Sequence, residues 1–236
     1  MNVLVPAGSL VSGARLPLDA LETHHLRVRR AGAGETVRLL DGAGAVAEGM
    51  LDLGRRDAAV TVGTVRMEAP PTPLVLAIGA GERDRFAWVV EKAAELGVTE
   101  IIPLETEHTH GVASRLRGGQ VERLRRRALE AIKQCGAPWA PQVREPVELG
   151  RFAEEPRSGI RWLAALEGRV PPAGIGADPV TIAVGPEGGF TPEERWKLEA
   201  AGFQPVKFGD YILRFETAAL AGAVYTGVAR KRGIDA

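Results

Sequence analysis

Residues 182–194 have the sequence IAVGPEGGFTPEE, in which a short apolar strand runs into a glycine-rich turn and then into a helix. The helix start is well marked, because Thr191 is a suitable N-cap, Pro192 suits the first turn and Glu194 completes a capping box. The glycines of the turn allow positive φ angles and a close approach of the backbone to a ligand. The turn is therefore either an ordinary tight connection or a ligand-binding loop.

Apolar strands and amphipathic helices alternate around this unit. We expect strands at 74–78, 100–104, 161–166, 179–184 and 205–208, and helices at 85–96, at 120–134 and from Glu216 onward. Such a βαβα order is typical of a largely parallel sheet covered by helices. The sequence therefore predicts an α/β fold for most of the chain.

Two further loops follow strands of that sheet. Glu167 and Gly168 follow the strand that ends at Leu166, and residues 209–214 (GDYILR) follow the strand that ends at Phe208. The carboxyl ends of parallel strands share one edge of a sheet, and ligands bind at that edge. We therefore expect a pocket lined largely by backbone groups, with an apolar floor near residues 212–213 that suits an adenine ring.

The amino-terminal part has a different pattern. Residues 67–73 (MEAPPTP) hold three prolines in four positions, which excludes a helix interior or a central strand. We place a domain boundary there, between residues 1–70 and 74–236. Within the first part, strand-like runs at 36–41 and 58–66 lie between glycine turns, and this pattern predicts a small β-barrel.

Basic residues gather at two places. From 115 to 133 the chain has seven basic residues against two acidic ones, and residues 24–30 have the sequence HHLRVRR. Arginine suits the recognition of phosphate, although charges on the outer face of a helix are usually only solvated. Both stretches therefore leave a choice between an RNA contact and an ordinary polar surface.

Composition narrows the class of protein. The chain has 236 residues, of which 45% are hydrophobic and 25% are charged, as in an average globular protein. Its apolar runs are too short to span a bilayer, and its start has no signal-peptide pattern. We therefore expect a cytoplasmic protein. A net charge of zero removes global steering towards nucleic acid but leaves local patches.

The number and spacing of cysteine and histidine residues argue against a disulfide and against a metal site. The single cysteine, Cys135, rules out an intramolecular disulfide, and it lies on the apolar stripe of its helix, where we expect a buried thiol. His108 and His110 would share one face of a strand, but no further ligands complete a metal site, so we expect no metal. The chain also has neither a phosphate-loop motif nor a Ser-His-Asp arrangement.

Taken together, these motifs resemble the RsmE family, the 16S ribosomal RNA uridine-N3 methyltransferases of the SPOUT class. The resemblance covers nearly the whole chain, through residues 23–26 (THHL), 41–42 (DG), 91–98 (EKAAELGV), 101–103 (IIP), 127–135 (RALEAIKQC) with Pro141, 185–189 (GPEGG) and 212–218 (ILRFETA). The last two motifs, in this order and spacing, are the most specific.

The resemblance implies a small PUA-like β-barrel that binds RNA, followed by a SPOUT-type parallel-sheet domain with a deep trefoil knot. It also implies a cytoplasmic homodimer, S-adenosylmethionine as cofactor, and 16S ribosomal RNA or the small ribosomal subunit as substrate, with no membrane. The cofactor contacts that it carries over are Leu166, Glu167, Gly185, Pro186, Glu187, Gly188, Gly209, Ile212, Leu213, Arg214 and Thr217.

Methyl transfer to uracil N3 requires loss of the N3 proton and stabilisation of negative charge on the flanking carbonyl oxygens. A preorganised cation provides that stabilisation, and Arg214 is our candidate. Glu216 is a candidate base, or a partner that orients Arg214; a salt bridge between the two that only holds the loop is the alternative. Phosphate contacts position RNA without specifying its sequence, and the candidates for them are His25, Arg29, Arg30, Arg123, Arg126 and Arg127.

Two other functions stay open. One is a knotted methyltransferase that modifies another RNA position or atom, and the other is a non-catalytic module for RNA binding or ribosome assembly. The chain also departs from the family pattern, mainly at positions expected to face RNA. These departures are Ala80, His108, Thr109, Ala137, Tyr211 and Phe215.

Overall fold

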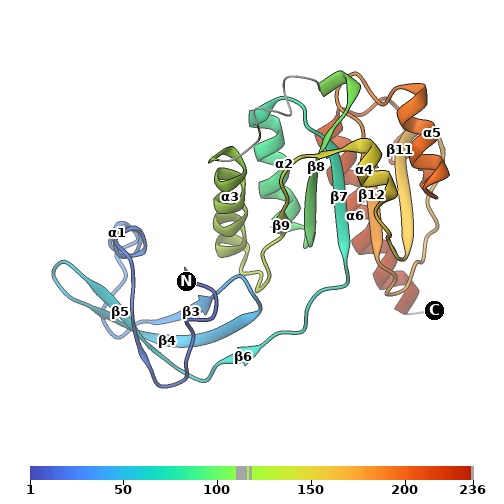
Figure 1. The fold of residues 1–236 in the computed structure, drawn as a ribbon. Helices are drawn as coiled ribbons and strands as arrows, with labels where there is room; N and C mark the ends of the chain where they lie inside the picture. Colours follow the sequence, from blue (N-terminus) through green and yellow to red (C-terminus); the bar gives the residue numbers. More distant parts are fainter. Residues whose placement is uncertain (110–115, 117–118, 235–236) are drawn as a thin grey trace. The chain divides into compact units, whose positions relative to one another are not determined.

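The computed structural model describes residues 1–109, 116 and 119–234, with side chains up to residue 230 (Figure 1). The chain forms two compact units. Unit 1 comprises Met1–Pro71 together with Leu129–Ala140, and unit 2 comprises Thr72–Ala128 and Pro141–Ala236. In the described part of the chain, no helix is long and apolar enough to cross a membrane.

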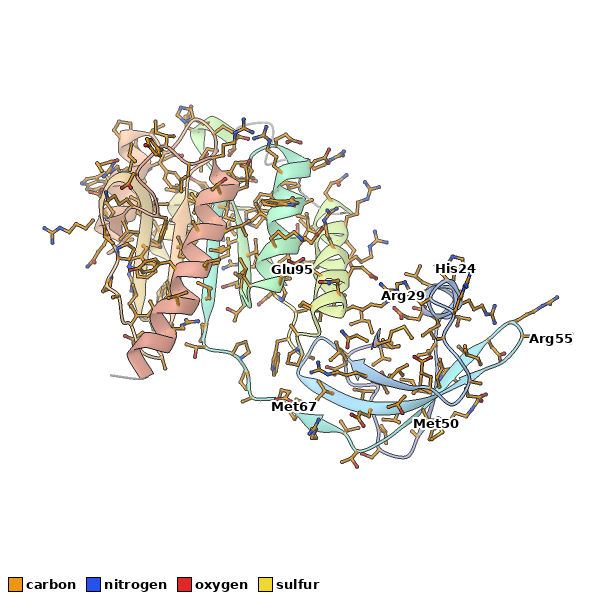
Figure 2. The ribbon with its side chains drawn as sticks, turned by 180° about the vertical axis from the view of Figure 1, so that it is seen from behind. His24, Arg29, Met50, Arg55, Met67 and Glu95 are labelled. Carbon is orange, nitrogen blue, oxygen red and sulfur yellow. The ribbon has the colours of Figure 1, made fainter. Side chains whose placement is uncertain are left out.

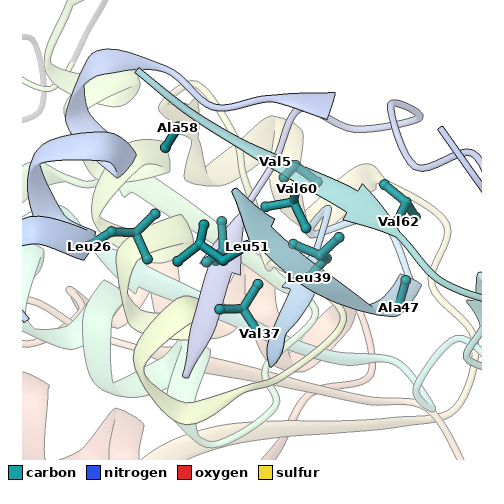
Figure 3. Close-up of a cluster of buried hydrophobic side chains, with 10 residues drawn as sticks. Val5, Leu26, Val37, Leu39, Ala47, Leu51, Ala58, Val60 and Val62 are labelled. Atoms are coloured by element: carbon teal, nitrogen blue, oxygen red, sulfur yellow. The ribbon is translucent and has the colours of Figure 1, made fainter. Parts of the chain in front are cut away.

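Unit 1 is built around a six-stranded sheet. Its elements are β1 (Asn2–Leu4), β2 (Arg15–Pro17), α1 (Ala20–Val28), β3 (Thr36–Leu40), β4 (Ala45–Leu53), β5 (Ala58–Val62) and β6 (Arg66–Met67). The strand order is β1-β3-β4-β5-β2, with β6 paired to β4, and only the β1–β3 pair is parallel. The apolar faces of these strands and Leu26 of α1 form one buried core (Figure 3).

The run expected as one strand at 58–66 is two strands. It is interrupted at Gly63, where an added Cβ would lie 2.7 Å from the carbonyl oxygen of Glu48. The amide of Gly63 donates to that same oxygen, at 2.7 Å. Residues 63–65, which begin at this close approach, separate β5 from β6.

Unit 1 also takes in the C-terminal half of α3 (Gly119–Cys135). Gly44 donates its amide to the carbonyl of Pro138 at 2.9 Å. Lys133 Nζ lies 2.5 Å from Glu22 Oε1 of α1, and both side chains are buried. The prediction of a buried Cys135 is wrong, since this thiol is exposed. In the last turns of α3, Lys133 occupies the buried face instead.

Unit 2 is built around a seven-stranded sheet whose strand pairs are all parallel, which confirms the α/β expectation. Its remaining elements are β7 (Leu74–Gly79), α2 (Arg83–Glu95), β8 (Glu100–Glu105), the 3-10 turn η1 (Glu107–Thr109), β9 (Gln142–Val143), β10 (Val147–Glu148), α4 (Leu149–Glu154), β11 (Ile160–Arg169), β12 (Val180–Val184), α5 (Pro192–Ala200), β13 (Gln204–Val206) and α6 (Phe215–Ile234). The order is β10-β8-β7-β12-β11-β13, with β9 paired to β8.

Helices cover both faces of this sheet. Helix α6 packs on β7, β12 and α2, whereas α4 and α5 pack together on the other face (Figure 1). The side chains of β7 alternate between the two layers, and its six residues are all buried. This burial on both faces explains the continuous apolar sequence of β7.

Two local predictions are wrong. Glu167 and Gly168 belong to β11, which continues to Arg169, and its register against β13 shifts between Ala164 and Arg169. Gly168 permits this irregularity, because an added Cβ would lie 2.4 Å from the backbone nitrogen of Val206. His108 lies in the 3-10 turn η1 rather than in a strand, and His110 lies outside the described residues.

Candidate functional site

A cavity of about 720 Å³ opens at the carboxyl edge of β11, β12 and β13, within unit 2. This is the edge where ligands bind in parallel sheets, and the volume suits a small-molecule site. The residues from the sequence-predicted cofactor set that line it are Leu166, Gly185, Pro186, Glu187, Gly209, Ile212, Leu213 and Arg214. Residues from the end of β11 and from the loops after β12 and β13 therefore meet at one cavity.

Three residues of that set lie outside the cavity lining. The carboxylate of Glu167 pairs with Arg195 and is 60% exposed. Gly188 faces His108, because an added Cβ would lie 2.9 Å from the ring atoms Cγ and Nδ1. Thr217 is exposed on the first turns of α6.

The loop after β12 packs tightly against the loop after β7. An added Cβ on Gly79 would lie 2.4 Å from Pro186 Cδ, and one on Gly81 would lie 2.6 Å from Glu187 Oε2. The amide of Glu82 donates to Glu187 Oε1 at 3.4 Å. Glu187 therefore joins the two loops, while Gly79 leaves room for Pro186 and Gly81 leaves room for the Glu187 carboxylate.

The segment after β8 is tied to the same loop. The predicted capping box of α5 forms, with Thr191 and Glu194 bonded reciprocally. The other carboxylate oxygen of Glu194 accepts the amide of Glu107 at 2.8 Å. His108 Nδ1 lies 2.9 Å from the carbonyl oxygen of Gly189. These bonds fix the glycine-rich turn from its far side.

Several cavity residues were not selected by the sequence analysis, among them Glu82 and Arg85. Arg85 Nη1 donates to Glu216 Oε1 at 3.2 Å, and its Nε donates to Glu82 Oε2 at 3.1 Å. Glu216 thus pairs with Arg85 rather than with Arg214, and its side chain is only 13% exposed. Only the fold brings these residues together, because residues 85 and 216 lie 131 positions apart.

Arg214 lines the cavity and is exposed. Apolar side chains flank the same opening, since Leu166 is 44% and Ile212 is 86% exposed. Behind them, the ring of Phe208 packs against Trp162 at 6.0 Å between centroids. The cavity therefore combines an apolar wall with the guanidinium groups of Arg85 and Arg214.

A second cavity of about 690 Å³ adjoins the first. Glu82 and Glu187 line both cavities. The second is also lined by His108 and Gln120. Among the described residues, no group of three metal-ligating side chains comes together.

The predicted RNA contacts fall in both units. In unit 1, Arg29 and Arg30 are exposed at the end of α1 and His25 is half-buried on it. In unit 2, the predicted contacts on α3 are Arg123, Arg126 and Arg127; all three are exposed, but Arg127 Nη2 also pairs with Glu91 at 2.7 Å.

Unit 1 adds basic residues that the sequence analysis did not select. Arg27 Nη2 donates to the carbonyl of Gly54 at 3.1 Å, which ties α1 to the β4–β5 turn. Arg55 and Arg56 are exposed in this turn, and Figure 2 shows Arg55 projecting from it, with His24 and Arg29 on α1. The turn thereby extends the basic surface of α1.

Comparison with known proteins adds independent findings. Residues 68–225 match the model of a family described as an RNA methyltransferase domain. The chain is 34% identical over 226 residues to ribosomal RNA small subunit methyltransferase E of Synechocystis sp., covering 91% of this chain and 73% of that protein.

Solved structures agree over almost the whole chain. Ribosomal RNA small subunit methyltransferase E of Neisseria gonorrhoeae, bound to S-adenosyl methionine, has a TM-score of 0.80 at 26% identity, with 94% of each chain covered. A methyltransferase of Legionella pneumophila in complex with the same cofactor has a TM-score of 0.78 at 25% identity, with 96% of each covered.

Proposed function

Because the chain belongs to the ribosomal RNA small subunit methyltransferase E family, we propose that it transfers the methyl group of S-adenosylmethionine to N3 of a uridine in 16S ribosomal RNA. It is an S-adenosylmethionine-dependent 16S ribosomal RNA methyltransferase. The choice of uridine N3 follows the family resemblance. The observation that supports the proposal is the cavity at the carboxyl edge of β11, β12 and β13, which most of the predicted cofactor residues line.

The cavity suits the cofactor in size and chemistry. An adenine ring needs apolar surface, which Leu166, Phe208 and Leu213 supply, and backbone groups of residues 185–187, 189 and 209 lie beside it. Such a small number of polar groups on an apolar wall is typical of cofactor sites. When bound, S-adenosylmethionine supplies an electrophilic methyl group on a sulfonium, and the proposed reaction uses no metal ion.

Arg214 is the proposed catalytic cation. Negative charge spreads onto the uracil oxygens as N3 loses its proton, and a preorganised guanidinium at the cavity edge stabilises that charge. Glu216 has the proposed role of a positioning residue, since its carboxylate holds Arg85 at the cavity. Holding the two reactants in line supplies much of the remaining rate enhancement.

Exposed arginines make the proposed RNA contacts. In unit 1 these are Arg29, Arg30, Arg55 and Arg56, together with His25, and in unit 2 they are Arg123, Arg126 and Arg127. Guanidinium groups bind phosphates sequence-independently, so these contacts position the RNA while the cavity selects the reacting atom.

Four further features follow the family resemblance as proposals. Residues 1–70 would form a PUA-like RNA-binding barrel, residues 74–236 a methyltransferase domain with a trefoil knot, and the protein would act as a cytoplasmic homodimer. Exposed apolar side chains on α6 support a homodimer, since Val224 is 49% and Val228 is 47% exposed. A paired α6 would remove this apolar surface from water.

A calorimetric titration with S-adenosylmethionine tests the cofactor site. Ala165 lines the cavity, so Ala165→Phe places a ring inside it and should abolish binding. Ala177→Phe is the matched control, because Ala177 is exposed in the loop before β12 and lies outside the lining. Failure of the folded wild-type protein to bind, with or without RNA, would favour a non-catalytic RNA-binding module instead.

Mass-spectrometric mapping of the methylated nucleotide tests the target atom. Small subunits or 16S ribosomal RNA lacking the modification, incubated with protein and cofactor, should gain one methyl group on uridine N3. A methyl group on a ribose hydroxyl or another base would leave the methyltransferase activity standing and refute the proposed position.

A further inference from the structure

His108 is held against the glycine-rich turn in a fixed orientation. Its Nδ1 lies 2.9 Å from the carbonyl oxygen of Gly189. Its ring lies so close to Gly188 that an added Cβ there would be 2.9 Å from Cγ and Nδ1. The turn therefore accommodates this imidazole only because residue 188 is glycine.

The hydrogen bond to Gly189 decides which ring nitrogen carries the proton. A carbonyl oxygen can only accept, so Nδ1 must donate to it. A neutral imidazole has one donor and one acceptor nitrogen. The hydrogen-bond partner of one nitrogen therefore decides whether the other nitrogen carries the proton. Nε2 of His108 is therefore left with a free electron pair on the ring edge away from Gly189.

His108 also lines the second cavity. This cavity has a volume of about 690 Å³, enough for a nucleobase, and shares Glu82 and Glu187 with the cofactor cavity. Gly189, the partner of His108, lines the cofactor cavity. A base in the second cavity would thus lie next to a cofactor in the first, with His108 beside the wall between them. Arg214 lines the first cavity and not the second, so its proposed role requires the uracil oxygens to lie at the boundary that the two cavities share.

We propose that the second cavity receives the target uracil and that Nε2 of His108 accepts its N3 proton. The proposal rests on the proposed uridine-N3 methylation. The N3–H bond gives its electron pair to N3 as the proton passes to Nε2, and N3 attacks the methyl carbon of S-adenosylmethionine. The carbon–sulfur bond breaks, its electron pair stays on sulfur, and the imidazolium releases its proton to water, since His108 is exposed.

This assignment also accounts for base selection. Uracil presents an N–H donor at position 3, which complements an acceptor nitrogen. Cytosine presents an acceptor there, so two acceptors would face each other and no hydrogen bond would form. Glu216 is the poorer base, since it lines neither cavity and its Oε1 accepts a hydrogen bond from Arg85.

Two substitutions separate catalysis from support of the turn. In His108→Asn, the side-chain amide can still donate to Gly189, but no basic nitrogen remains. In His108→Gln, the amide reaches towards the Nε2 position and loses the bond to Gly189. A general base contributes about 10²–10⁴-fold. We therefore expect the single-turnover rate of both variants, at saturating cofactor, to fall by about that factor, with unchanged cofactor affinity for His108→Asn.

A substrate variant gives a readout that a supporting role would not change. The fluorine of 5-fluorouridine makes the N3 proton more acidic, so the rate of methyl transfer depends less on a general base of the enzyme. The deficit is the ratio of the wild-type single-turnover rate to the rate of His108→Asn. On 16S ribosomal RNA transcribed with 5-fluorouridine, this ratio should be at least about tenfold smaller than on unmodified RNA.

Three results would overturn the inference. These are a His108→Asn rate within about threefold of wild type, equal deficits on both RNAs, or loss of cofactor binding in His108→Asn. The methylated atom is mapped with wild-type protein first. Methylation at another atom would therefore refute the proposed function without any variant.

Discussion

Replacing Lys133 by methionine should strongly destabilise unit 1. Lys133 Nζ lies 2.5 Å from Glu22 Oε1, and the two side chains are 7% and 6% exposed. In the part of the chain that the structure describes, the other Glu22 oxygen, Oε2, is buried and accepts no hydrogen bond. Methionine fills a similar volume, so the substitution removes the charge and its hydrogen bond with little loss of packing.

The size of the effect follows from the geometry. At 2.5 Å and an effective dielectric constant of about 20, the attraction is about 7 kcal/mol. Taking two ions out of water costs several kcal/mol for each, so the intact pair contributes little net stability. Removing Lys133 leaves the cost of burying the Glu22 charge without the attraction that offsets it. We therefore expect the free energy of unfolding of unit 1 to fall by about 3–5 kcal/mol. Glu22→Leu combined with Lys133→Met should recover most of it.

Hydrogen exchange of peptides from β3, β4 and β5 measures this loss in unit 1 by itself. Arg15→Met is the control, because Arg15 pairs with Asp52 at the exposed surface of unit 1, and it should leave the exchange of these peptides almost unchanged. The reasoning is refuted if Lys133→Met costs less than about 1 kcal/mol, or if the double variant is as unstable as the single one.

Three further predictions concern both units. Thr191→Ala removes the N-cap of α5 and should cost about 1 kcal/mol in urea unfolding, whereas Thr191→Ser should retain most of it. Arg55→Ala with Arg56→Ala should weaken RNA binding uniformly across sequences, as measured by filter binding. The slope of log affinity against log salt concentration should become shallower by about one for each lost phosphate contact. The hydrogen bond from Arg144 lowers the pKa of Glu155. Because the pKa of Glu155 is lower in the folded state, its carboxylate stabilises the folded protein at pH values above the unfolded-state pKa. This stabilisation is lost as the pH falls through the folded-state pKa. Wild type and Glu155→Gln should therefore differ in melting temperature at neutral pH and converge in acid.

Local patterns located most of the elements of unit 2. Continuous apolar runs marked β7 and β12, since both faces of a parallel sheet are covered. Thr191, Pro192 and Glu194 marked the start of α5, because capping depends on neighbouring residues. The shared edge of parallel strands also correctly predicted that the loops after β12 and β13 meet at one cavity.

The predictions failed where long-range contacts override local pattern. The strand prediction around His108 gave way to a turn held by Gly189, 81 residues away. Cys135 is exposed, and Lys133 is buried instead. The charge of Lys133 is compensated by Glu22, 111 residues away. An apolar stripe records only which side chains avoid water, whereas a buried charge requires a partner that the sequence does not reveal.

The sequence by itself determined the alternation of strands and helices, the glycine-rich turn, the cap of α5 and the resemblance to a methyltransferase family. These depend on neighbouring residues and on side-chain periodicity. Only the tertiary structure decided that Glu187 joins two loops, that Arg85 pairs with Glu216 and that His108 lies between the glycine-rich turn and a second cavity. These contacts join residues far apart in the chain, and packing of the whole sheet and its helices sets their distances.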